Sequence, residues 1–201
     1  MKKRKLFILI DWWKENIAVE RFKYPTTVTK VEKNIEKLMK RVIESDNSDW
    51  YVPLSTNYVD SKYTAGSLKK EPEIDKYSDF YTFGMTLGAC VLMNDWGYCY
   101  LPRDKRAILQ DCSISEDIAD GGIVTIDKYI KYLKDKKRNF ENAELEHNNQ
   151  IKEEIERYAE KGAAWVHESS YIKEPHRYEF KKEELYDPVK FKNLDEIYRT
   201  I

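Results

Sequence analysis

Short apolar runs near the start of the chain predict two strands. Residues 6–10 are all apolar, and the run ends at Asp11. A continuous run of this length, bounded by charge, is typical of a strand that is buried on both faces. Residues 17–22 predict a second strand, with residues 12–16 turning the chain between the two.

Residues 28–42 predict an amphipathic helix. Apolar residues recur at intervals of three and four and therefore share one helical face: Val28, Val31, Ile35, Leu38 and Val42. Basic residues form a stripe on another face: Lys30, Lys33, Lys37 and Arg41. Thr29 and Glu32 have the spacing of a capping box, which would start the helix. A solvated helix face explains the basic stripe without any ligand.

The following residues, 46–79, predict a long loop. Pro53, Gly66 and Pro72 punctuate this segment, and several aromatic residues are scattered through it. A loop of this length is uncommon in a compact domain and is usually functional or disordered. The aromatic residues favour an ordered loop that packs against the domain.

Residues 80–101 form the most apolar region, and its pattern fits either helix or strand. Residues 94–97 (Asn-Asp-Trp-Gly) are a good turn between the apolar segments 89–93 and 98–101. We therefore favour strands. The helical alternative is based on Gly84 and Gly88, whose spacing of four would let a helix approach a neighbour closely.

A long helix is predicted from about residue 125 to residue 161. Neither Gly nor Pro occurs between residues 123 and 161; Thr125 can cap the start, and Gly162 follows the last turn. Apolar residues occupy both ends of one seam, whereas Lys137, Glu144 and His147 lie in its middle. The segment is either one helix that bridges separate partners or a helical hairpin that breaks near residues 147–149.

Residues 162–201 predict an extended arm that ends in a short helix capped by Asn193. Widely spaced aromatic residues in this arm are the candidate interface, because Tyr and Trp suit surfaces that a partner covers. They are Trp165, Tyr171, Tyr178, Phe180, Tyr186, Phe191 and Tyr198.

The elements together indicate the α+β class, with a small mixed sheet, an amphipathic helix, the long helix and the aromatic arm. We expect a mixed core over residues 1–124, the helix or hairpin over 125–161 and the arm over 162–201. The length of 201 residues suits one domain with appendages.

Composition and charge restrict the partners. Charged residues make up 35% of the chain, above the usual quarter, so we expect a large surface around a modest core. The net charge of -1 gives no long-range attraction to nucleic acid, so a nucleic-acid contact would have to be local, for example at residues 2–5 or 134–138.

The longest apolar stretch, residues 80–93, is shorter than the roughly 20 residues that span a bilayer, so no membrane partner is expected. Three cysteines are an odd count without a repeating frame, which favours a reducing compartment: the cytoplasm, or a particle assembled there.

Asp11 is the best single catalytic candidate in the sequence, because it follows the first predicted strand and ligands of open α/β sheets bind at the carboxyl ends of strands. With Asp60, Asp79 or Asp111 it could form a small metal-dependent nuclease-like site. Trp12 would crowd an approaching phosphate, however, and an aspartate that simply ends the strand is the preferred interpretation. We therefore assign no catalytic residue.

No metal or cofactor is predicted. Residues 116–127 resemble the second half of a calcium-binding EF-hand or dockerin loop, but Ile118 stands where an oxygen ligand is required. The cysteines and histidines lack the paired spacing of zinc sites, and phosphate-binding and nucleophile motifs are missing. Ser67 and Cys112 are unconstrained nucleophile candidates.

The sequence therefore favours a non-enzymatic protein that binds other protein subunits, as a homo- or hetero-oligomer, for example in a phage particle or another large assembly. The alternatives are an inhibitor of a host defence or nucleic-acid enzyme, and the nuclease-like enzyme built around Asp11.

Overall fold

The computed structural model describes most of the chain, in seven segments. They are residues 3–53, 61–64, 66–85, 87–88, 90–114, 140–163 and 187–201.

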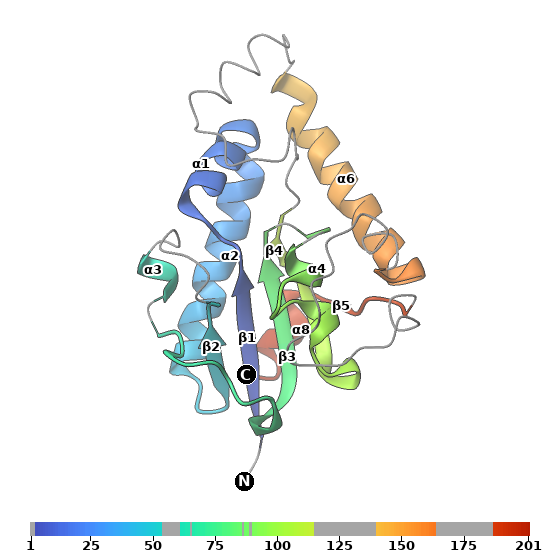
Figure 1. Cartoon of the computed structure of the whole chain (residues 1–201). Coiled ribbons are helices and arrows are strands. Elements are labelled where there is room, and N and C mark those ends of the chain that lie inside the picture. Colours follow the sequence, from blue (N-terminus) through green and yellow to red (C-terminus); the bar gives the residue numbers. More distant parts are fainter. Residues whose placement is uncertain are drawn as a thin grey trace.

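Five parallel strands form one sheet in the order β2-β1-β3-β4-β5 (Figure 1). The strands are β1 (Arg4–Ile10), β2 (Ser48–Tyr51), β3 (Tyr77–Gly84), β4 (Arg106–Ser113) and β5 (Phe191–Lys192). The expected α+β class, helices combined with a small sheet, is confirmed. Among the described strands the sheet is not mixed in direction, however, because every pair of neighbours runs parallel.

Residues 6–10 of β1 are completely buried, as their apolar run predicts. Side chains alternate across the sheet, so Phe7 and Leu9 belong to one hydrophobic cluster, whereas Leu6, Ile8 and Ile10 belong to the other. A parallel sheet needs cover on both faces, and the two clusters provide it.

Helices lie on both faces of the sheet (Figure 1). The first cluster contains residues from α1 (Lys14–Lys23), α2 (Pro25–Glu44) and α8 (Leu194–Tyr198). The second contains residues from α4 (Cys90–Met93), from the 3-10 helix η2 (Tyr98–Tyr100) and from α6 (Phe140–Lys161). The short elements α3 (Ser61–Thr64), η1 (Ile74–Lys76) and η3 (Arg103–Lys105) complete the described structure. In these described helices, no stretch has both the length and the apolar character needed to cross a membrane.

The strand predicted over residues 17–22 is wrong, because these residues belong to α1. The segment packs by Ile17 against the cluster that contains α2, and both edges of β1 are already paired, one with β2 and the other with β3. A six-residue apolar run cannot by itself distinguish helix from strand.

The apolar face of α2 is confirmed, since Val28, Val31, Ile35, Leu38 and Val42 are all buried. The capping box is wrong, because the helix begins at Pro25 and Thr29 lies inside it. Proline at the first helical position suits this start, since its ring fixes the φ angle that the helix needs. The cap comes instead from Glu144 of α6, whose Oε1 accepts a hydrogen bond of 2.5 Å from the amide of Thr27.

The loop predicted over residues 46–79 is wrong where β2, α3, η1 and the first residues of β3 occupy it. Strand β2 is only four residues long and begins with Ser48 and Asp49, so its sequence lacks a strong strand signal. Pairing with β1 defines it, with Phe7 opposite Trp50. Residues 54–60 and 65 lie outside the described residues.

The two strands predicted over residues 89–93 and 98–101 are wrong, although the turn between them is confirmed. These segments are α4 and η2, and the amide of Gly97 donates to the carbonyl of Asn94 over 2.5 Å. The apolar residues cover one face of the sheet instead.

Helix α6 is continuous from Phe140 to Lys161, so the unbroken helix is confirmed over these residues and the alternative of a hairpin that breaks near residues 147–149 is wrong. His147 is buried against Tyr24, which accounts for a polar residue in the middle of the seam. The predicted end is confirmed: Gly162 has φ 71°, and its amide donates to the carbonyl of Tyr158 over 3.0 Å. The predicted start near Thr125 lies outside the described residues.

Residues 187–201 return to the sheet as β5 and α8. The predicted cap is confirmed, since Asn193 and Glu196 form a capping box at the start of α8. Phe191 packs, partly buried, against the second cluster, and Tyr198 packs against the first. The other five candidate interface residues, Trp165, Tyr171, Tyr178, Phe180 and Tyr186, lie outside the described residues.

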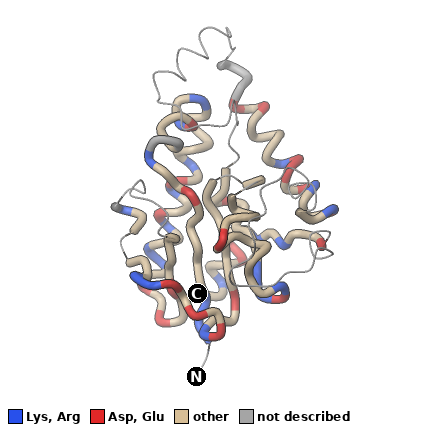
Figure 2. Tube along the Cα trace, in the orientation of Figure 1, with Lys and Arg blue, Asp and Glu red and all other residues tan. Residues whose placement is uncertain are grey.

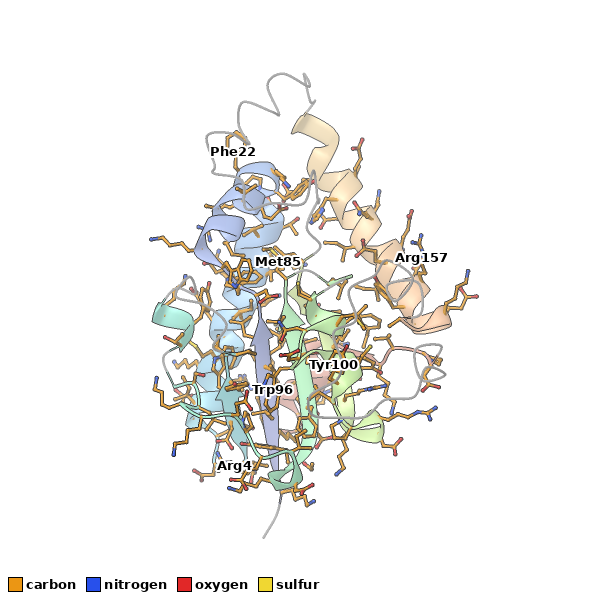
Figure 3. The ribbon with its side chains drawn as sticks, in the orientation of Figure 1. Arg4, Phe22, Met85, Trp96, Tyr100 and Arg157 are labelled. Carbon is orange, nitrogen blue, oxygen red and sulfur yellow. The ribbon has the colours of Figure 1, made fainter. Side chains whose placement is uncertain are left out.

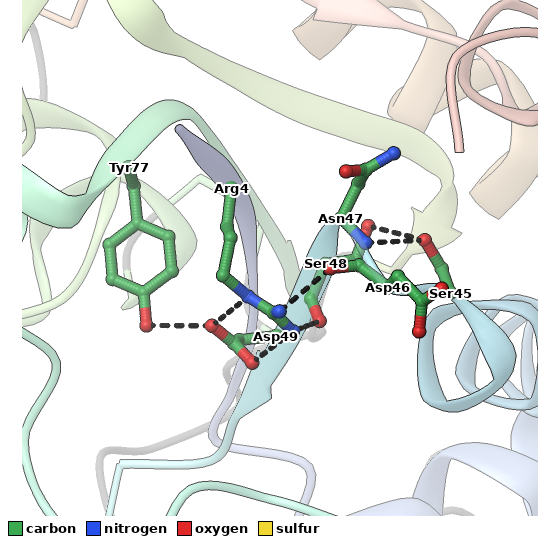
Figure 4. A network of polar contacts seen from close by, with 7 residues as sticks. All are labelled: Arg4, Ser45, Asp46, Asn47, Ser48, Asp49 and Tyr77. Atoms are coloured by element: carbon green, nitrogen blue, oxygen red, sulfur yellow. Dashed lines mark hydrogen bonds and ion pairs between the residues drawn. The ribbon is translucent and has the colours of Figure 1, made fainter. Parts of the chain in front are cut away.

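Arg4 ties the amino ends of three strands together (Figure 4). Its guanidinium donates two hydrogen bonds of 2.8 Å to the Asp49 carboxylate and further bonds to the carbonyls of Asp46 and Ser48. The hydroxyl of Tyr77, at the start of β3, donates to the same carboxylate over 3.0 Å. The planar fork of arginine fits such a carboxylate with two parallel bonds, which lysine cannot reproduce.

We expect Arg4→Lys to lower the free energy of unfolding by about 1 kcal/mol, because a lysine keeps the charge but loses most of these bonds. The Arg4 side chain is 42% exposed, which screens the ion pair and keeps the effect small. Urea unfolding followed by circular dichroism would measure it. Lys76→Arg, in an exposed pair with Glu73, is the control and should change the unfolding free energy by less than about 0.5 kcal/mol. If Arg4→Lys and Lys76→Arg changed the unfolding free energy equally, a special role for the two guanidinium bonds of Arg4 to Asp49 would be contradicted.

Candidate functional site

The strand order reverses at β1, which has β2 on one side and β3 on the other. In open parallel sheets, ligands bind beyond the carboxyl ends of the strands at such a switch point. Asp11 follows β1 with φ 45°, a left-handed conformation that residues other than glycine seldom adopt. Gly84 ends β3 with φ 127°, and the next amide, of Met85, donates to the carbonyl of Ile10 over 3.1 Å. Met85 lies near the carboxyl end of the sheet (Figure 3).

The acids proposed to join Asp11 are not brought to it. Asp79 pairs in register with Lys5, near the opposite end of β1, about 20 Å from Asp11 at 3.3 Å per residue. The carboxylate of Asp111 accepts the amide of Leu194 over 2.8 Å, and Asp60 lies outside the described residues. In the part of the chain that the structure describes, no three His, Cys, Asp or Glu residues gather where they could hold a metal ion.

The two nucleophile candidates, Ser67 and Cys112, are buried side chains with a structural role. The hydroxyl of Ser67 accepts the amide of Val52 over 3.0 Å, in a buried position. Burial, together with the neighbouring charge of Asp111, raises the pKa of the Cys112 thiol well above its usual value, which opposes formation of a thiolate. Cys90, Cys99 and Cys112 form no disulfide with one another.

A polar contact joins the corner between α1 and α2 to α6. Lys23 and Glu20 form a buried ion pair of 2.5 Å within α1, and the ring of Tyr24 stacks on that of His147 with centroids 3.8 Å apart. Burial alone would raise the pKa of Glu144, but the amide of Thr27 donates to its carboxylate and lowers that pKa below the usual value. Sequence reasoning did not anticipate this contact, because its partners lie more than a hundred residues apart.

A hollow of about 190 Å³ lies beside the residues that follow β1, between α1, α2 and α3. We call it the Trp12 pocket, and it is lined by Trp12, Lys14, Ile17, Ala18, Arg21, Glu32, Lys62 and Tyr63. The rings of Trp12 and Tyr63 are both almost completely buried and meet edge to face, with centroids 6.2 Å apart. Sequence reasoning missed this pocket, since it had placed α1 as a strand and α3 in a loop.

Glu32 is the polar centre of the Trp12 pocket. Its carboxylate accepts hydrogen bonds from Arg21 at 2.6 Å, Lys62 at 2.8 Å and the Tyr63 hydroxyl at 2.7 Å. Burial would raise the pKa of Glu32, but these donors and the nearby positive charges lower it below the usual value. Burial and the bond to Glu32 raise the pKa of Tyr63 to about 12. The carboxylate is therefore charged and the phenol neutral around pH 7.

The basic residues of α2 are confirmed as exposed. We call Lys30, Lys33, Lys37 and Arg41 the α2 basic stripe. It extends about 16 Å along the helix at 1.5 Å per residue. Within the described residues no ion pair engages the three lysines, whereas Arg41 lies over the ring of Tyr198 at 4.2 Å.

Helix α6 exposes an acidic stripe. We call Glu146, Glu153, Glu156 and Glu160 the α6 acidic stripe; its residues are exposed and extend over about 21 Å. Arg157 interrupts it, and Glu156 has a loose ion pair of 3.9 Å with Lys152. The recurrence of Lys and Arg along α2 and of Glu along α6 can be followed in Figure 2. Leu145, beside this stripe, has 63% of its surface exposed.

Comparison with protein-family models, with curated proteins and with solved structures finds no significant match in any of the three.

Proposed function

We propose that this protein is a non-enzymatic assembly subunit, in which the α2 basic stripe of one copy binds the α6 acidic stripe of the next. The observation that supports the proposal is that one chain exposes two helical stripes of opposite charge. Lys30, Lys33 and Lys37 present positive charge on one surface. Glu146, Glu153 and Glu160 present negative charge on the other.

The positions of the two stripes favour a head-to-tail arrangement. Helix α2 packs on one face of the sheet and α6 on the other, so the stripes lie on different sides of the molecule. A contact between two different surfaces of identical subunits is heterologous, and it propagates into a ring or an open filament. A dimer that buried the same surface of both copies would bring like charges together.

The expected affinity follows from the kind of contact. Exposed ion pairs contribute about 0.2–1 kcal/mol each, so four pairs give at most about 4 kcal/mol, close to a dissociation constant of 1 mM. Closure of a ring would make the final contact intramolecular and strengthen the assembly. Salt should weaken the association, because the Debye length falls from about 10 Å at 0.1 M to about 3 Å at 1 M.

We expect the protein to self-associate at low ionic strength and to become monomeric near 1 M salt, as measured by sedimentation velocity at several protein concentrations. Lys33→Glu with Lys37→Glu should abolish the low-salt association, and so should Glu153→Lys with Glu160→Lys. A mixture of the two double variants should associate again, because each then presents the charge that the other lacks.

The matched control is Lys69→Glu with Lys70→Glu, which changes the net charge equally at exposed positions outside both stripes. It should associate like the original protein. A monomer at every salt concentration would contradict the proposal and would favour an inhibitor that binds a different protein. Failure of the mixed variants to associate would show that the two stripes are not partners.

A further inference from the structure

We infer that the Trp12 pocket binds a small ligand that carries an oxyanion, a phosphate or a carboxylate, on a single flat ring. This site is separate from the two stripes, and the inference does not depend on the proposed self-assembly.

The charge and hydrogen-bonding capacity of the lining favour an anion. Lys14, Arg21 and Lys62 line the pocket together with the single carboxylate of Glu32, while Glu36, which pairs with Lys62 at 3.3 Å, lies outside the lining. That carboxylate already accepts bonds from three side chains, so it offers little to a cationic ligand. A ligand that fits this lining must supply acceptors.

Two side chains at the pocket, Arg21 and Trp12, have N–H groups that form no hydrogen bond of normal geometry within the described residues. Among the described residues Arg21 donates to Glu32 through Nη2, while a guanidinium has five N–H donors. The indole Nε1–H of Trp12 is buried beside the Tyr63 hydroxyl, but in the part of the chain that the structure describes it forms no hydrogen bond of normal geometry. A buried donor without an acceptor costs about 1–3 kcal/mol, which an oxyanion bound here would recover.

The size and the apolar wall limit the rest of the ligand. Trp12, Tyr63, Ile17 and Ala18 supply the apolar surface, and the volume is about 190 Å³. A cavity of about 150 Å³ is sufficient for benzene, so the pocket accommodates one ring with a small charged group but not a two-ring base with a sugar.

The test follows the indole Nε1–H signals of the ¹⁵N-labelled full chain by NMR, with the five tryptophan signals assigned by triple-resonance experiments. The probes are phenyl phosphate and benzoate, with benzyl alcohol and inorganic phosphate as controls. We expect the Trp12 signal to move downfield and to saturate with phenyl phosphate, benzoate or both, near 1 mM. The stronger of these two probes identifies phosphate or carboxylate as the preferred group.

Arg21→Gln should weaken binding of the charged ring about tenfold, whereas Lys152→Gln, at an exposed position on α6, should leave it unchanged. Equal shifts with benzyl alcohol would overturn the anion preference, and equal shifts with inorganic phosphate would overturn the ring. No movement of the Trp12 signal with any probe, or no difference between the two variants, would overturn the site.

Discussion

Gly84→Ala is expected to lower the free energy of unfolding by about 4 kcal/mol, one of the two largest effects predicted for a single substitution in this chain. A Cβ at this position would lie 2.1 Å from the carbonyl oxygen of Ile10, well inside contact distance. That oxygen belongs to the backbone of β1, so it cannot rotate away as a side chain could. The φ of 127° adds conformational strain for any residue with a Cβ.

Gly162→Ala is the matched control, because it tests a positive φ of 71° at a helix end. It should lower the unfolding free energy by about 1 kcal/mol, the usual penalty of a left-handed residue. Both variants can be compared by urea unfolding with circular dichroism detection. If Gly84→Ala were no worse than Gly162→Ala, the close approach of β3 to β1 at this edge would be contradicted.

Lys23→Met is expected to lower the unfolding free energy by about 3 kcal/mol. The ammonium of Lys23 lies 2.5 Å from the carboxylate of Glu20, and both side chains are at least 98% buried. Removing one partner of a buried pair leaves the other charge in a poorly solvated position, which is more destabilising than the pair itself is stabilising. The double variant Glu20→Leu with Lys23→Met should therefore recover much of the loss.

A double-mutant cycle over these two positions measures their coupling. Lys152→Met is the control, since its ion pair with Glu156 is 3.9 Å long and exposed, and the change should stay within about 0.5 kcal/mol. A Lys23→Met effect as small as that of Lys152→Met would mean that water reaches the Glu20–Lys23 pair. A double variant less stable than Lys23→Met would mean that Glu20 has a further stabilising contact.

The sequence is a good guide where a pattern is local. The apolar run of residues 6–10, the spacing of the buried residues of α2, and Gly162 all express interactions within one element, and all three predictions are confirmed. The exposure of Lys30, Lys33 and Lys37 follows from the same helical period.

The remaining features depend on contacts between distant residues. Strand β2 is defined by its register with β1, and the start of α2 is capped by Glu144, 117 positions away from Thr27. The Trp12 pocket unites α1, α2 and α3, which no motif links. Because residues 17–22 were predicted as a strand, Arg21 could not be recognised as a pocket residue.

The short strand β5 has a consequence for the order of folding during synthesis. Strand β4 ends at Ser113, and β5 begins 78 residues later, at Phe191. At roughly 5–20 residues per second, the ribosome needs about 4–16 s to translate this interval. During that time the outer edge of β4 has unpaired backbone groups that could recruit another chain. A chaperone that shields a nascent strand edge would therefore protect the unfinished sheet, and most of all when translation is slow.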